Sequence, residues 1–170
     1  MTRYAAFLRS VMPSNCAMPE LARAFEAAGF ADVKTLLSSG NVTFAARAQS
    51  GAALERKAEK AIREALGREF MTFVRSIDEL RAILASDPYR GMPLGADAKC
   101  VVTFLREPPK PPPALPIERD GACVWQLDGR ELFSAYLRSD KGPVFMTLIE
   151  KAIGRGQTTR TWQTLEKMAR

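Results

Sequence analysis

The sequence predicts an α+β protein with a ferredoxin-like first lobe and a smaller C-terminal lobe. Over the first lobe, short β-rich runs and two amphipathic helices follow one another in the order β-α-β-β-α-β, which is the ferredoxin-like arrangement. In the second half, the Asp-Gly pairs at 120–121 and 128–129 separate three apolar runs, which is typical of an antiparallel meander. We therefore expect lobes at 1–76 and 99–170, joined by a connecting helix and loop over 77–98.

The first lobe opens with a strand, a helix and a hairpin. Residues 3–9 form an apolar run that predicts a buried strand. The stretch MPELARAFEAAGF places Pro19 in a first helical turn and Gly29 at the C-terminal end, where each is favoured. Two β-rich runs at 33–37 and 42–45 flank the turn sequence SSGN, and this pattern predicts a hairpin.

A second helix, a strand and the connecting helix follow. The clearest helix covers 51–66, with Ser50 placed to cap it. A strand follows at 69–75. Ser76 and Glu79 have the spacing of a capping box, which marks the start of the connecting helix.

The second lobe begins with a buried strand at 100–105. The proline-rich segment 107–116 cannot form a helix or a central strand, so it is expected to be an extended crossover. Gly142-Pro143 marks the start of a helix after the meander. The chain ends with a short extended piece at 157–159 and a helix capped by Thr161.

Composition excludes several chemistries. The chain of 170 residues contains no histidine, which removes histidine-based triads, proton shuttles and metal sites. It carries no glycine-rich phosphate loop and no zinc pattern, so we expect no metal and no cofactor. The net charge of +6 weakly favours phosphorylated or polyanionic ligands, and a Lys/Arg-rich surface is the simpler explanation of it.

The cysteines and the distribution of apolar residues indicate the cellular compartment in which the protein is expected. Three cysteines without a CxxC pair indicate free thiols in a reducing environment. Cys100 and Cys123 lie in apolar runs typical of a core, whereas Cys16 precedes a helix start, where a thiol pKa can fall. No run approaches the ~20 apolar residues that cross a bilayer, and the N-terminus does not resemble a cleaved signal. We expect a cytoplasmic protein that does not interact with membranes.

The first candidate ligand site lies at one end of the first lobe. The loop after the first strand, the hairpin turn and the electropositive N-terminus of the first helix should emerge at the same end of the split sheet. An anion could bind there between the polar residues Arg9, Ser10, Ser38, Ser39, Gly40 and Asn41. Ordinary turn chemistry is the alternative explanation for these residues.

The second candidate lies where the last helix begins. Hydroxyls, a guanidinium and an indole there could hold an anion and a stacked ring, and a lysine before the preceding helix could add charge. The residues are Lys141, Thr158, Thr159, Arg160, Thr161 and Trp162. Alternatively, Thr161 is only a helix cap and Trp162 packs between the lobes.

Several segments resemble one bacterial family. They are YAAFLRSV with MPELARAFEAAGFADVKTLLSSGNVTF, then VTFL, GREL and the ending KAIGRGQTTRTWQTLEKMA. The sequence is similar to the domain-of-unknown-function 1697 (DUF1697) family from residue 4 to residue 169. Members often carry a glycine-rich stretch where this chain has residues 9–15, and Asn-Trp-Asn where it has 161–163. The resemblance implies an α+β fold with a ferredoxin-like first lobe, and it implies no reaction.

Three functions stay open. The first is a binding protein for an anionic small molecule or a nucleic acid. The second is a histidine-free enzyme acting on a phosphorylated substrate through Arg9, Lys141 or Arg160, although no carboxylate stands out as its general base. The third is a protein that forms homodimers through exposed sheet edges.

Overall fold

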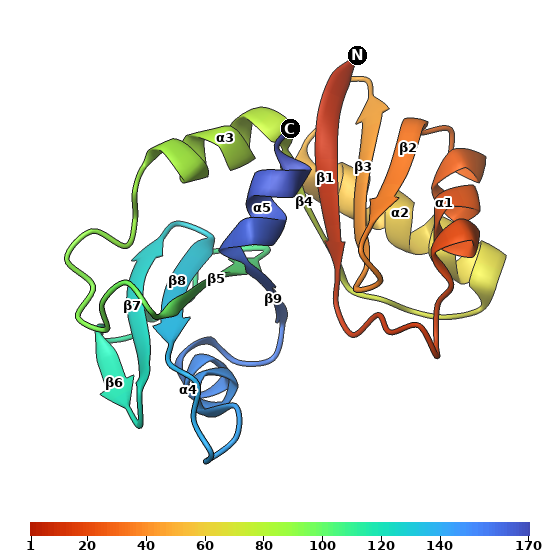
Figure 1. Ribbon diagram of the computed structural model, residues 1–170. Helices are drawn as coiled ribbons and strands as arrows, with labels where there is room; N and C mark the ends of the chain where they lie inside the picture. Colours follow the sequence, from red (N-terminus) through yellow and green to blue (C-terminus); the bar gives the residue numbers. More distant parts are fainter. The chain divides into compact units, whose positions relative to one another are not determined.

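The chain forms two compact units, each built on one antiparallel sheet. The computed structural model describes residues 1–170. The first unit comprises residues 1–82 with 167–170, and the second comprises residues 83–166. Two antiparallel sheets and five helices confirm the predicted α+β class (Figure 1).

The first unit holds a four-stranded sheet in the order β2-β3-β1-β4, with every neighbouring pair antiparallel. Its strands are β1 (Thr2–Leu8), β2 (Ala31–Leu36), β3 (Asn41–Ala46) and β4 (Thr72–Ser76). Helices α1 (Met18–Ala27) and α2 (Gly51–Leu66) connect them in the predicted order β-α-β-β-α-β. Both helices lie on the same side of the sheet in Figure 1.

An aromatic cluster fills the space between these helices and the sheet. Phe44 on β3 lies 4.5 Å from Phe30 and 5.6 Å from both Phe25 and Tyr4, measured between ring centroids. All four residues are buried, and buried aromatic side chains contribute strongly to core stability. Tyr4 and Phe7 of β1 are both buried, so neither is an exposed aromatic of the kind that stacks RNA bases.

The local helix signals are confirmed. The Ser50 Oγ accepts a hydrogen bond of 3.2 Å from the Ala53 amide at the start of α2. At α3 (Ile77–Ala85) the capping box is reciprocal. The Ser76 amide donates to Glu79 Oε2 at 2.6 Å, and the Glu79 amide donates to Ser76 Oγ at 3.0 Å.

Two carboxylates of α2 satisfy amides of the edge strand β4. Glu55 Oε2 accepts from the Val74 amide at 3.0 Å, and Glu59 Oε1 accepts from the Thr72 amide at 3.2 Å. The two glutamates are four residues apart and therefore share a helix face. An edge strand leaves alternate amides without a sheet partner, and these glutamates cover two of them.

The second unit holds a five-stranded sheet in the order β6-β7-β8-β5-β9. Its strands are β5 (Lys99–Leu105), β6 (Ile117–Arg119), β7 (Ala122–Asp128), β8 (Glu131–Tyr136) and β9 (Gln157–Thr161). Helix α4 (Val144–Ile153) lies within this unit, and α5 (Trp162–Met168) begins in it and ends in the first unit. Strands β6, β7 and β8 are the predicted meander. Helix α4 packs through Leu148 and Ile149 on one face of this sheet.

Candidate functional site

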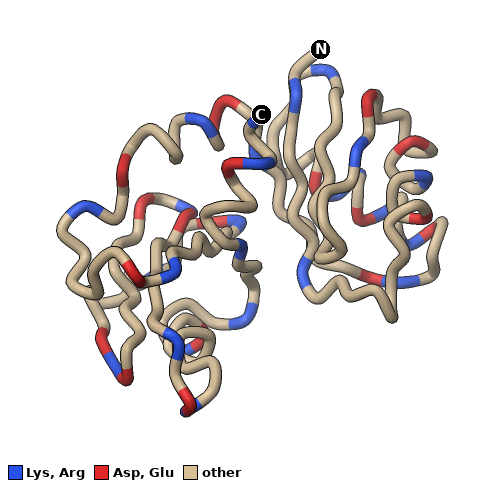
Figure 2. Tube along the Cα trace, viewed as in Figure 1, with Lys and Arg blue, Asp and Glu red and all other residues tan.

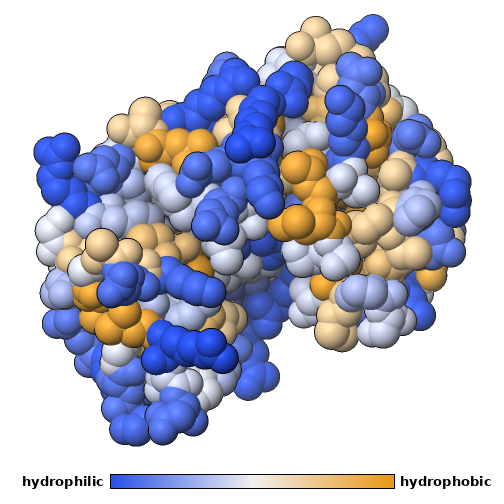
Figure 3. All heavy atoms as spheres, viewed as in Figure 1, coloured by the Kyte–Doolittle hydropathy of each residue, from blue (hydrophilic) through white to orange (hydrophobic).

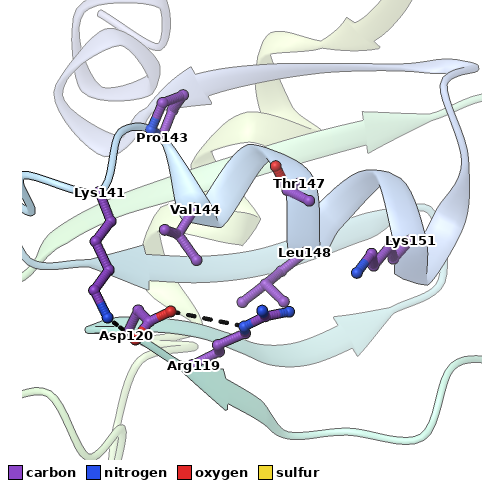
Figure 4. Close-up of a pocket in the computed structure, with 8 residues that line it drawn as sticks. All are labelled: Arg119, Asp120, Lys141, Pro143, Val144, Thr147, Leu148 and Lys151. Atoms are coloured by element: carbon purple, nitrogen blue, oxygen red, sulfur yellow. Dashed lines mark hydrogen bonds and ion pairs between the residues drawn. The ribbon is translucent and has the colours of Figure 1, made fainter.

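The second unit carries a pocket surrounded by cationic side chains, here called the basic pocket. It encloses about 330 Å³. It is lined by Arg119, Asp120, Lys141, Pro143, Val144, Thr147, Leu148 and Lys151 (Figure 4). Three positive charges against one negative charge give its lining a net charge of +2. Elsewhere the Lys and Arg residues are spread over both units (Figure 2).

The turn between β6 and β7 places Arg119 and Asp120 on one side of this pocket. Asp120 and Gly121 both adopt positive φ, 47° and 79°, as a two-residue type I′ hairpin turn requires. The turn positions Arg119 at the end of β6 and Asp120 beside it. Helix α4 supplies Thr147 and Lys151, which are four residues apart and so share a face.

An ion-pair chain crosses the pocket. Lys141 Nζ donates to Asp120 Oδ1 at 2.9 Å, and Arg119 Nε lies 3.7 Å from Asp120 Oδ2. The hydrogen bond from Lys141, followed by its charge, holds the pKa of Asp120 below its ordinary value. The carboxylate therefore stays ionised at neutral pH and ties the β6–β7 turn to the segment before α4.

Other donors of the pocket are unused within the chain. Lys151 makes no ion pair, the Thr147 hydroxyl makes no hydrogen bond, and the outer nitrogens of Arg119 make none either. A guanidinium presents its nitrogens in a planar fork that matches the oxygens of a carboxylate or phosphate. The pocket is thus suited to an oxyanion between the β6–β7 turn and α4.

A second pocket of about 400 Å³ lies at the end of β9 and has an aromatic wall; we call it the aromatic pocket. It is lined by Ala98, Lys99, Cys100, Tyr136, Thr161, Trp162, Gln163 and Glu166. Tyr89 supports the Trp162 indole edge-on, with 5.3 Å between ring centroids. Hydrophobic and hydrophilic side chains are interspersed on the face of the second unit seen in Figure 3.

The buried phenol of Tyr89 should make the folded protein less stable at high pH. Its hydroxyl donates to the Val101 carbonyl at 2.6 Å, and burial raises the pKa of the phenol above its ordinary value. Because the folded pKa exceeds the unfolded value of about 10, the stabilisation is complete below pH ~10 and is lost as pH rises further. We expect Tyr89→Phe to reduce this alkaline decline in urea unfolding and to cost about 1–2 kcal/mol at neutral pH. Tyr136→Phe is the control, and an equal effect of both changes would contradict this role.

The structure brings the loop and the turn of the first predicted site together. The Leu8 amide donates to the Gly40 carbonyl at 2.9 Å, so the end of β1, directly before Arg9 and Ser10, lies against the hairpin turn. Within the turn, Asn41 Nδ2 donates to Leu36 O and to Ser39 Oγ. These bonds are the turn chemistry weighed as the alternative, and a ligand role for this cluster stays a prediction.

The loop that precedes α1 is also organised by its own side chains. Asn15 accepts from the Met12 amide and donates to the Ser10 carbonyl, each at 2.9 Å. Cys16 is buried, and burial, followed by the charge of Glu20, raises the pKa of its thiol. The pKa of this thiol is therefore raised and not lowered, although Cys16 lies directly before a helix start.

The second predicted site divides between several environments. Arg160 is buried, and its Nη1 donates to Thr158 Oγ1 at 2.6 Å and to the Thr159 carbonyl at 3.0 Å. Burial lowers the pKa of this guanidinium to about 10, so it remains charged at neutral pH. The Thr159 hydroxyl lies 2.8 Å from that of Thr103 on β5.

The remaining members of that site line the two pockets. Thr161 Oγ1 accepts from the Thr164 amide at 3.2 Å, which confirms the predicted cap. Thr161 and Trp162 line the aromatic pocket, whereas Lys141 lines the basic pocket. The sequence interpretation did not single out Arg119, Thr147 and Lys151, which also line the basic pocket. The available signal was Arg119 directly before an Asp-Gly turn, with Lys141 three residues before the start of α4.

Residues 1–133 match the protein family described as "Protein of unknown function (DUF1697)". The chain belongs to the DUF1697 family. This match covers residues 1–82 of the first unit and continues into β8, and the DUF1697 resemblance seen in the sequence is thereby confirmed. No protein with a curated description matches the chain.

The fold is also found in a solved structure. The conserved bacterial protein SP0830 from Streptococcus pneumoniae superposes with a TM-score of 0.71 at 20% sequence identity. The alignment covers 99% of this chain and 97% of the pneumococcal chain, so both units are shared. Of the helices in this structure, none has the length and apolar character needed to span a bilayer.

Proposed function

We propose that the protein binds a small anion bearing phosphate or carboxylate groups in the basic pocket. The observation that carries the proposal is a set of unused donors around one cavity: Lys151, the Thr147 hydroxyl and the outer nitrogens of Arg119. Charge-assisted hydrogen bonds to an oxyanion are the strongest contacts such donors can make.

Asp120 supports this role by holding the pocket in place. Its carboxylate fixes Lys141 and orients the Arg119 side chain through Nε, which leaves the outer guanidinium edge for a ligand. The pairs are partly exposed, with 65% of the Lys141 side chain and 33% of the Asp120 side chain accessible. Salt therefore screens these charges, and anion affinity should fall as ionic strength rises.

Calorimetric titration with inorganic tripolyphosphate at low salt tests the proposal. The probe should bind the wild type, and Lys151→Ala should weaken binding roughly fivefold, since one exposed charge contact contributes about 1 kcal/mol. Arg119→Ala should weaken tripolyphosphate binding more than Lys151→Ala does, because it removes the planar fork of guanidinium nitrogens.

Lys110→Ala is the matched control, since it removes the same charge from an exposed position of the second unit outside the pocket. It should leave the affinity within twofold of the wild type. A wild type that binds no tripolyphosphate, or an equal loss in the Lys110 and Lys151 variants, would contradict the proposal.

A further inference from the structure

The basic pocket is larger than the anion that its charges attract. Its volume of about 330 Å³ lies at the lower end of the range, roughly 300–1,000 Å³, that is usual for pockets that bind organic molecules. At the roughly 30 Å³ that a water molecule occupies in the liquid, this space corresponds to about eleven water molecules, more than one phosphate group displaces. A ligand that fills the pocket therefore carries an organic group beside its oxyanion.

One wall of the basic pocket is apolar. It is formed at the start of α4 by Pro143, Val144 and Leu148. Leu148 is buried, whereas Pro143 is exposed and Val144 is half-buried, so these two side chains are accessible to a ligand. In Figure 4 the side chains of Val144 and Leu148 lie between α4 and the turn that carries Arg119 and Asp120. An apolar group bound beside the cations would lose contact with water against this wall.

The lining of the basic pocket contains no aromatic ring, which bears on the kind of organic group it can hold. Nucleobases and other planar rings are commonly held by stacking on aromatic side chains. Proline, valine and leucine side chains instead make many small dispersion contacts with saturated groups of complementary shape. The wall therefore favours an aliphatic group over a nucleobase.

The charge of the lining matches a dianion. Arg119, Lys141 and Lys151 against Asp120 give a net charge of +2. A phosphate monoester carries roughly −1.5 to −2 at pH 7, because its second pKa is about 6. A carboxylate or a sulfate monoester carries only a single negative charge. The phosphate monoester is therefore the anion that comes closest to neutralising the pocket.

We propose that the ligand of the basic pocket is a phosphate monoester of a short aliphatic group. This inference rests on the proposed function and names the class of anion. The phosphate would lie between Arg119 and Lys151, and the aliphatic group would lie against Pro143 and Val144. Tripolyphosphate then reproduces only the anionic end of the ligand.

A series of small anions tests both halves of this inference on the wild type. NMR titration followed at the backbone amides of α4 gives a dissociation constant for each. Butyl phosphate should bind about tenfold more tightly than inorganic phosphate, since burying two methylene groups contributes about that factor. Glycerol phosphate carries hydroxyls in place of the apolar surface, so it should bind within about threefold of inorganic phosphate. Butyl sulfate should bind about tenfold more weakly than butyl phosphate, because it carries one charge less.

The dependence of binding on pH gives a second readout of the ligand's charge. On going from roughly pH 7.5 to pH 5.5, butyl phosphate gains a proton and becomes a monoanion. Asp120 stays ionised over this range, because the hydrogen bond and charge of Lys141 hold its pKa below the ordinary value, and Arg119 and Lys151 stay cationic. The affinity for butyl phosphate should therefore fall several-fold toward that of butyl sulfate, whose own affinity should stay constant.

Val144→Ala tests the apolar wall. It should reduce the advantage of butyl phosphate over inorganic phosphate from about tenfold to about threefold. It should leave the affinity for tripolyphosphate within twofold, which also shows that the variant is folded. Val33→Ala is the matched control, since Val33 is a half-buried valine of the first unit outside the pocket, and it should change neither quantity.

The outcomes distinguish this inference from the proposed function. If tripolyphosphate binds but butyl phosphate binds no more tightly than inorganic or glycerol phosphate, the aliphatic group is overturned and the anion site stands. If butyl sulfate binds as tightly as butyl phosphate, the phosphate monoester is overturned. Equal effects of Val144→Ala and Val33→Ala would overturn the position of the aliphatic group. If neither tripolyphosphate nor butyl phosphate binds, the proposed function fails and the inference fails with it.

Discussion

Gly40→Ala should lower the free energy of unfolding by about 3 kcal/mol, because it adds a methyl group where the loop after β1 meets the β2–β3 turn. A Cβ atom on Gly40 would lie 2.9 Å from Val11 Cβ, which is closer than Cβ atoms approach in practice, and 3.0 Å from Leu8 Cβ, which is an unusually tight contact. The residue also has a φ of +83°, which disfavours any side chain. Both contact atoms are at the base of their side chains and cannot rotate away.

Gly129→Ala is the matched control for Gly40. Its φ is +58°, but no atom lies within 4 Å of an added Cβ, so only the backbone cost of about 1 kcal/mol is expected. Urea unfolding followed by far-UV circular dichroism measures both variants. Equal losses in the two variants would show that residues 9–18 and 38–41 do not meet.

Glu55→Ala should destabilise the protein by about 2–3 kcal/mol, because it leaves the buried amide of Val74 on β4 without its carboxylate acceptor. Glu55 is only 3% exposed, so water cannot readily replace the lost oxygen. The amide of Val74 should also exchange its hydrogen faster, which NMR can follow residue by residue.

Two further variants serve as controls for the loss of stability in Glu55→Ala. Glu55→Gln keeps an acceptor oxygen and should recover part of the stability. Glu64→Ala lies on the same helix but removes only an exposed ion pair with Lys60, so it should change stability by no more than about 0.5 kcal/mol. A Glu55→Ala protein as stable as Glu64→Ala would contradict the edge-covering role.

Local signals in the sequence predicted most of the helices and turns. The start of α2 follows from Ser50, whose side chain caps it. The start of α3 follows from the Ser76 and Glu79 pair. These features depend on a few neighbouring residues, so they can be recognised without knowing the fold.

Contacts between distant segments could not be predicted in the same way. The stretch from Gln157 was expected to be extended, but its pairing with β5 across more than fifty residues had no local signal. Glu55 and Glu59 likewise resemble ordinary surface residues of an amphipathic helix. Their role depends on the edge of β4, which exists only once the sheet has formed.

The candidate site illustrates the same limit. Lys141 was singled out from the sequence because it precedes a helix, and it does lie in a pocket. Its partner Asp120 is twenty-one positions away and had been interpreted only as a turn residue. The basic pocket arises because the β6–β7 turn and α4 converge, and periodicity within either segment carries no information on that.

The most direct test is a crystal structure grown in the presence of tungstate, whose anomalous scattering locates an oxyanion without ambiguity. The basic pocket should hold the anion within hydrogen-bonding distance of Arg119, Lys151 or Thr147. Tungstate bound beside Ser10 and Asn41 instead, with the basic pocket empty, would contradict the account.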